Sequence, residues 1–177
     1  MQQPTFRLQE QQKRIGQKFG VSEWVTVTQD MIDQFGAITL DPDPMHQDPE
    51  WCRQFSPYRS TVAYGFLTMS LLTTMMHNVV PYDKYGHAGS SGYALNYGFD
   101  RVRLVEPVPV GSRVRAHFTL LDVRERGPGE LFQKVLTEIE IENRDRPALV
   151  AEWLFLWITG QGHERIVRPD GAAQGKA

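Results

Sequence analysis

The stretch FLTMSLLTTMMH, residues 66–77, contains no Asp, Glu, Lys or Arg and decides the fold. Its apolar side chains cover most of the circumference of a helix: Phe66, Leu67, Met69, Leu71, Leu72, Met75 and Met76. A helix that is apolar on most sides must be surrounded by other elements. The interspersed serine and threonine residues make the stretch too polar for lipid, so no membrane association is expected. The stretch therefore predicts a buried core helix that begins near Gly65.

After residue 92 the hydrophobic pattern changes from a helical period to a period of two. Four segments are expected as strands: 93–105, 113–120, 135–142 and 148–159. Gly98 marks a bend in the first of them, and Gly127-Pro128-Gly129 forms a turn. The last segment is apolar on both faces apart from Glu152, which is typical of a strand in the middle of a sheet. One helix followed by antiparallel strands predicts an α+β domain with a curved sheet around a central helix.

Length and composition indicate one ordinary globular domain. The chain has 177 residues, of which 41% are hydrophobic and 23% charged, and its formal net charge is −2. This charge gives no basic excess, so a nucleic acid is not an expected partner. We expect a polar N-terminal segment over 1–15, the domain over 16–160 and a flexible tail over 161–177.

The cysteine count and the N-terminus indicate a cytoplasmic protein. Cys52 is the single cysteine, so the chain has no internal disulfide, and we expect its thiol to be buried beside Trp51 and Phe55. The first ten residues, MQQPTFRLQE, have no apolar signal-peptide core. A reducing cytoplasm is consistent with both observations.

The segment before the core helix carries the candidate catalytic groups. Asp41 and His46 are separated by Pro42 and Pro44, and proline lacks the N–H donor that a helix interior requires. We therefore expect both residues on a constrained loop. Thr28 caps a helix before this loop, and Asp48-Pro49-Glu50 has the residue order that starts a short helix after it.

Gly65 supplies a third candidate group at the start of the core helix. The first N–H groups of a helix have no partner within it, so Gly65 can donate to a developing negative oxygen. The stretch thus combines an acid, a base and an oxyanion donor. Taken singly, an Asp in a proline-rich loop is typical of a turn or a cap, and a lone His is typical of a structural or exposed residue.

Three separated motifs resemble one family. Asp41, Pro44 and His46 have D-x-x-P-x-H spacing, and they precede VAYGFL at 62–67. This resembles the MaoC-like dehydratases, or (R)-specific enoyl-CoA hydratases (hydratase 2), whose signature is S-G-D-x-N-P-x-H followed by A-H-G. The segments NYGFDRVR at 96–103 and PVPVG at 107–111 look like those of the nodulation-protein-N-like branch.

The resemblance spans about residues 16–159, and the sequence departs from the signature at three positions. Leu40 stands where the signature has Gly, Asp43 where it has Asn, and Tyr64 where it has His. The change to Asp43 replaces an amide by a group that normally only accepts, and it adds negative charge beside Asp41.

The resemblance implies a hotdog fold and a homodimer whose two sheets join edge to edge. It implies reversible syn addition of water to a trans-2-enoyl thioester, giving an (R)-3-hydroxyacyl thioester carried by coenzyme A or acyl carrier protein. Asp41 and His46 would hold the water as an acid/base pair, with Gly65 as oxyanion donor. The substrate-binding residues implied are Tyr64, Asp43, Arg101 and Arg103.

Alternatives remain for the arginines and for the activity. Arg101 and Arg103 are candidates for contact with the carrier's phosphates, but strand-face arginines are more often solvated or paired with acids. The sequence contains no metal, nicotinamide or flavin motif, so we expect no cofactor. An acyl-CoA thioesterase and a catalytically silent acyl-thioester-binding subunit remain as alternatives, and Asp43 and Tyr64 favour the second.

Overall fold

The computed structural model describes residues 8–80 and 93–158. The predicted flexible tail, 161–177, and residues 1–7 of the predicted polar segment lie outside this described part. The elements in chain order are α1 (Leu8–Gln12), β1 (Lys18–Val21), β2 (Val25–Thr26), α2 (Gln29–Thr39), α3 (Pro44–Gln47), α4 (Pro49–Phe55), α5 (Gly65–Ser70), α6 (Leu72–Val79), β3 (Tyr93–Leu104), β4 (Arg113–Gly127), β5 (Glu130–Ile141) and β6 (Leu149–Ile158).

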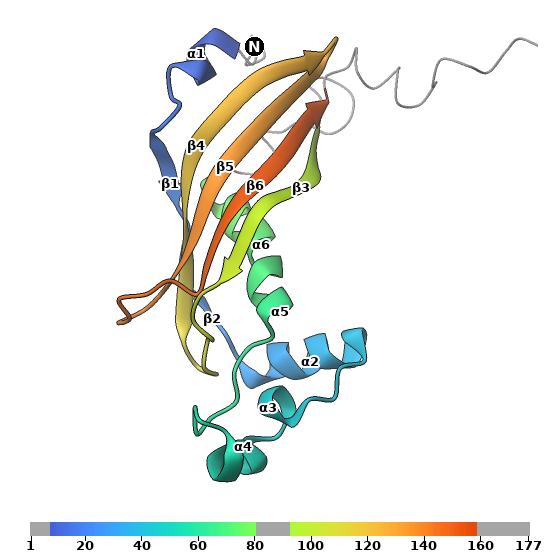
Figure 1. The fold of residues 1–177 in the computed structure, drawn as a ribbon, viewed down its shortest axis with the longest axis vertical. Helices are drawn as coiled ribbons and strands as arrows, with labels where there is room; N and C mark the ends of the chain where they lie inside the picture. Colours follow the sequence, from blue (N-terminus) through green and yellow to red (C-terminus); the bar gives the residue numbers. More distant parts are fainter. Residues whose placement is uncertain (1–7, 81–92, 159–177) are drawn as a thin grey trace, which may run out of the picture.

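The strands form one antiparallel sheet in the order β1-β4-β5-β6-β3, and β2 also pairs with β4. The sheet curves around α5 and α6, while α2, α3 and α4 lie beyond one end of it (Figure 1). The predicted position of β6 within the sheet is confirmed, because it pairs with β5 on one side and β3 on the other. The predicted bend at Gly98 is also confirmed by a register shift, with the glycine at φ 147°.

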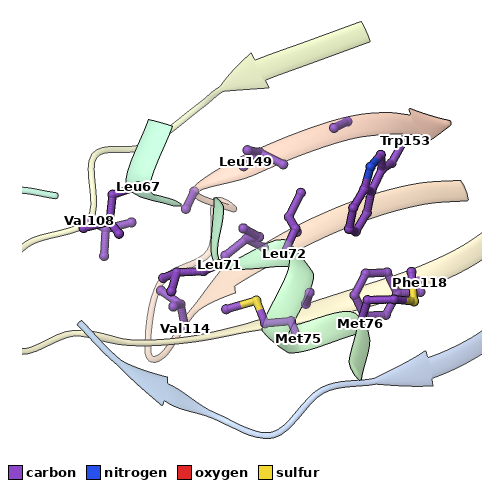
Figure 2. Packing of buried hydrophobic residues seen from close by; sticks show 14 of the residues in the cluster. Leu67, Leu71, Leu72, Met75, Met76, Val108, Val114, Phe118, Leu149 and Trp153 are labelled. Atoms are coloured by element: carbon purple, nitrogen blue, oxygen red, sulfur yellow. The ribbon is translucent and has the colours of Figure 1, made fainter. Parts of the chain in front are cut away.

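The core lies between the concave face of the sheet and the central helix. Leu67, Leu72 and Met75 are buried against sheet residues such as Phe118 and Trp153 (Figure 2). Full burial of one such apolar side chain contributes about 1.5–3 kcal/mol. Most of the stability of the helix therefore comes from packing against the sheet.

The central helix differs from its prediction in two respects. It is divided into α5 and α6 at Leu71, although Leu71 keeps helical angles (φ −63°, ψ −18°) and joins the two parts. It is also open on one side, where Phe66 is 70% exposed and Ser70, Thr73 and His77 face solvent. The prediction that the helix is surrounded on all sides is thus wrong for this single chain, because the polar residues gather on one side.

Ionic pairs cover part of the outer face of the sheet. Burial alternates along β4 as predicted, and His117 lies on its polar side. Glu140 accepts hydrogen bonds from Arg115 at 2.7 and 3.2 Å, and it lies 2.6 Å from Nε2 of His117. The Arg115 guanidinium also stacks over Trp24, 4.4 Å from the ring centre. The hydrogen bonds from Arg115 hold the pKa of Glu140 below its ordinary value.

The N-terminal part differs most from the prediction. Residues 18–21 form β1, and no strand was predicted there from the sequence. The strand exists because it pairs with residues 117–119 of β4, a partner about one hundred residues away. None of the helices in the described part of the chain is long and apolar enough to cross a membrane.

Candidate active site

The end of α2 delivers Asp41 through a left-handed turn. Thr28 caps the helix as predicted, with its Oγ1 3.3 Å from the backbone nitrogen of Met31. Leu40 adopts φ 58° and ψ 33°, and its N–H and that of Asp41 both donate to the carbonyl oxygen of Gly36. A glycine adopts this conformation without strain, which accounts for the Gly of the family signature. Asp41 is exposed on the loop, as expected.

His46 lies in a short helix, so its prediction as a loop residue is wrong. Pro44 occupies the first turn of α3, where its missing N–H costs no hydrogen bond. The Asp43 carboxylate caps this helix and accepts from the Met45 N–H at 2.8 Å. Asn and Asp cap helices about equally well. The departure at Asp43 therefore preserves the local fold.

The imidazole of His46 has a defined orientation. Its Nδ1 lies 2.6 Å from the carbonyl oxygen of Val62. A carbonyl oxygen only accepts hydrogen bonds, so Nδ1 carries a proton. In the neutral imidazole, Nε2 then presents a lone pair. The residue is half-buried, and no hydrogen bond of Nε2 is found within the described part of the chain.

Gln29 supports His46, and the sequence analysis missed it. Its Nε2 donates to the His46 carbonyl oxygen at 2.8 Å, and its Oε1 accepts from Thr61 Oγ1 at 2.5 Å. The spacing carried a signal, since residues 29, 32 and 36 lie on one face of a helix. The structure shows that this face is buried at Ile32 and Gly36. A polar side chain on the buried face of a helix requires partners.

Tyr64 contacts both candidate catalytic residues. Its phenol donates to the Asp41 carbonyl oxygen at 2.7 Å, and its ring centre lies 3.8 Å from that of His46. Only 4% of the residue is exposed. Burial, followed by the nearby Asp41 carboxylate, raises the pKa of the Tyr64 phenol above its ordinary value. The phenol is therefore a neutral donor at physiological pH.

Gly65 opens α5, as predicted, and its N–H has no hydrogen-bond partner among the described residues. The Leu104 side chain, on β3, lies so close that a Cβ at position 65 would overlap its Cδ1. Only glycine fits at this position without displacing Leu104.

The two arginines lie elsewhere on β3. Arg101 is 3.5 Å from Glu152, with its side chain 80% exposed, and Arg103 donates to the carbonyl oxygen of Val102. Within residues 8–80 and 93–158, no contact joins either arginine to Asp41 or His46. The substrate-binding roles of Arg101, Arg103, Tyr64 and Asp43 stay predictions.

A hollow of about 430 Å³ lies beside the loop. It is lined by Asp33, Gly36, Ala37, Leu40, Asp41, Pro42 and Gln47. It reaches Asp41 but neither His46 nor Gly65, so this hollow alone does not hold all three groups. The described residues contain no cluster of three or more His, Cys, Asp or Glu placed to hold a metal ion.

Residues 41–65 provide three chemical capabilities. The Asp41 carboxylate is exposed, neutral His46 presents a lone pair on Nε2, and the Gly65 N–H has no acceptor among the residues that the structure describes. A carboxylate and an imidazole exchange protons near neutral pH, and a free N–H stabilises a negative oxygen. This combination suits general acid/base chemistry on a carbonyl compound.

The family model described as "MaoC like domain" matches residues 10–142. Nodulation protein N of Rhizobium leguminosarum bv. viciae is 44% identical over 81% of this chain and 86% of its own length. The 3-hydroxyacyl-thioester dehydratase Z of Mycobacterium tuberculosis (strain ATCC 25618 / H37Rv) is 39% identical over 81% of this chain and 90% of its own.

Two solved structures have the same fold. The (R)-hydratase from A. caviae involved in PHA biosynthesis aligns with a TM-score of 0.62 and 21% identity, covering 80% of this chain and 94% of that one. The monoamine oxidase regulatory protein from Archaeoglobus fulgius aligns with a TM-score of 0.65 and 23% identity, covering 82% and 90%. The predicted hotdog fold is confirmed by these likenesses. By the family match and the identity to its relatives, the chain belongs to the MaoC-like dehydratase family.

Proposed function

We propose that this protein is a hydro-lyase that adds water reversibly to a trans-2-enoyl thioester and forms the (R)-3-hydroxyacyl thioester. The observation that carries the proposal is the geometry around His46, whose Nδ1–H is committed to Val62 while Nε2 is left as a proton acceptor. The retained Asp41 and the free Gly65 N–H supply the other two groups that the reaction needs. A relative carrying the name 3-hydroxyacyl-thioester dehydratase Z supports the same reaction class.

The chemistry uses the three groups together. One member of the Asp41–His46 pair takes a proton from water as the water oxygen bonds to C3 of the substrate. The C2=C3 electrons move toward the thioester carbonyl, whose oxygen becomes negative and accepts from the Gly65 N–H. A proton is then delivered to C2 on the same face, which gives syn addition. Because the pair is coupled, we assign the two proton transfers to it jointly.

We place the substrate on coenzyme A or acyl carrier protein and the active form in a homodimer. The outer edge of β3 has no partner strand among the described residues, and Leu95, Tyr97 and Leu104 are exposed along it. An exposed edge strand of this length is a template for pairing with another chain. Joining two β3 edges would give the long sheet that the family resemblance implies. Size-exclusion chromatography with light scattering tests for twice the monomer mass.

The test of activity is the loss of enoyl-thioester ultraviolet absorbance with crotonyl-CoA and with a longer enoyl-CoA. We expect turnover by the wild type, the (R) product by chiral analysis, and kcat losses of about 10²–10⁴-fold in Asp41→Asn and His46→Gln. The matched controls are Asp145→Asn, in the exposed turn between β5 and β6, and His117→Gln, on the polar side of β4, and both should keep wild-type rates. Equal losses in the controls would overturn the assignment of the pair.

Two further measurements separate the alternatives. Release of free thiol from a saturated acyl-CoA, followed with a thiol reagent, would identify a thioesterase. Enoyl-CoA binding by calorimetry without turnover would identify a silent acyl-thioester-binding subunit. Either result would overturn the proposed hydration reaction.

A further inference from the structure

We infer that Tyr64 is a positioning residue, which, together with Gly36, holds Asp41 and His46 in their mutual arrangement. The inference rests on the proposed function for the catalytic identity of the pair, but the clamp itself is a property of the folded chain. It assigns the tyrosine a task directed at its own chain, whereas the family resemblance placed it against substrate.

The backbone of Asp41 is fixed on both sides. Its N–H donates to the Gly36 carbonyl oxygen at 3.1 Å, and its carbonyl oxygen accepts from the Tyr64 phenol at 2.7 Å. The Asp43 N–H also reaches Asp41 Oδ1 at 3.2 Å. A loop segment held at both polar backbone atoms loses much of its freedom. The position of the Asp41 carboxylate thus depends on Tyr64.

The ring of His46 is held by the same residue. Tyr64 packs on one face of the imidazole, with the ring centres 3.8 Å apart, and Phe35 packs on the tyrosine at 5.4 Å. The bond from Nδ1 to Val62 fixes rotation in the ring plane, and the tyrosine ring limits tilting out of it. One side chain therefore determines where both partners of the acid/base pair lie.

Gly36 provides the space for the phenol. A Cβ built there would overlap the Tyr64 hydroxyl and the side-chain nitrogen of Gln47. Gly36 lies inside α2 and has no positive φ, so alanine suits its backbone and conflicts only with these two neighbours. Gly36→Ala should therefore displace the phenol without removing it, which makes it an independent test of the clamp.

The burial of Tyr64 predicts which kinetic parameter it controls. At 4% exposure, with its hydroxyl bonded to the main chain, it offers little surface to a substrate. Loss of the hydroxyl should thus lower kcat, which depends on the geometry of the pair, and leave KM within about twofold. If the hydroxyl bound substrate in the ground state, its loss would instead raise KM and leave kcat unchanged.

The experiment compares Tyr64→Phe, Gly36→Ala and their double variant with the wild type. Tyr58→Phe, which removes a hydroxyl from an exposed tyrosine, is the matched control. Thermal unfolding establishes that each variant is folded. Hydrogen exchange at the Asp41 amide, measured by NMR, reports the clamp without any substrate.

We expect Tyr64→Phe to lower the exchange protection of the Asp41 amide about five- to tenfold, the typical effect of one hydrogen bond. We expect kcat to fall by about tenfold with KM unchanged. Gly36→Ala should show the same pattern, and the double variant should show less than the product of the two effects, because both disturb one contact. Tyr58→Phe should change neither measurement.

Two outcomes would overturn the inference. One is unchanged Asp41 exchange in both single variants, and the other is a raised KM at constant kcat. A wild type that is inactive on enoyl thioesters but shows the exchange pattern would refute the proposed function and still support the clamp. The two claims therefore fail separately.

Discussion

The side chain of Leu104, on β3, lies directly over the Cα atom of Gly65, at the first residue of α5. The residue that carries the proposed oxyanion donor thus contacts the edge strand through which the proposed dimer forms, on the side where a Cβ would point. This relationship leads to the first prediction, which concerns the space around the glycine.

Gly65→Ala should drive its new Cβ into Leu104 and misplace the N–H, lowering kcat about 10–100-fold and stability by about 1–2 kcal/mol. Adding Leu104→Ala removes the atoms in conflict, so the double variant should recover part of both losses relative to Gly65→Ala alone. Steady-state kinetics and thermal unfolding of the wild type and the two variants measure this. No recovery in the double variant would refute the steric explanation.

Gln29→Leu should cost about 1–3 kcal/mol, because it leaves the buried Thr61 hydroxyl without its acceptor. The His46 carbonyl loses its donor at the same time, so kcat should also fall. The control is Gln34→Leu, on the same helix, whose side chain bonds only an exposed Asp30. Chemical denaturation should separate the two variants, and equal stability losses would contradict this role for Gln29.

Leu40→Gly should raise stability by about 1 kcal/mol, because Leu40 is held in a left-handed conformation while 86% exposed. Ile38→Gly, two residues earlier and inside α2, should instead lower stability by about 1 kcal/mol, since glycine disfavours the helical conformation of that residue. The two opposite shifts in urea midpoint form the test. A stability loss at both positions would show that the turn is not strained by leucine.

Glu140→Gln should lower stability near neutral pH by about 1 kcal/mol, through loss of the charged pair with Arg115. Because the pKa of Glu140 is lowered in the folded protein, its contribution is present above the unfolded-state pKa and lost as pH falls through the folded-state value. The stability gap between wild type and variant should therefore close in acid. Urea unfolding at a series of pH values measures the gap, and a constant gap would contradict this linkage.

Local sequence signals predicted much of the fold correctly. Thr28 and the Asp48-Pro49 pair act through neighbouring backbone groups, so the starts of α2 and α4 are visible in the sequence. The alternation along β4 and β5 reflects burial on one face of the sheet and was equally visible. β1 was missed because its existence depends on pairing with distant residues of β4.

The site shows the same division between local and distant causes. Asp41, His46 and Gly65 were proposed from their chemistry, their spacing and the family resemblance, and their catalytic roles stay predictions. The structure places Tyr64 in contact with the first two. The helical turn at His46 was missed, because Pro44 was interpreted as a helix breaker although it occupies the first turn. The bond from Tyr64 to Asp41 crosses 23 residues, and no local pattern encodes it.

The order of elements along the chain has a consequence for synthesis on the ribosome. Among the described strands, β1 and β2 pair only with β4, and the helix of α5 and α6 packs on strands that follow it. A nascent chain that has emerged to residue 80 therefore lacks the long strands of the sheet, and it exposes Leu72, Met75 and their neighbours to water or to a chaperone. The candidate catalytic residues and the central helix are thus translated before β4, β5 and β6, the strands on which the helix packs.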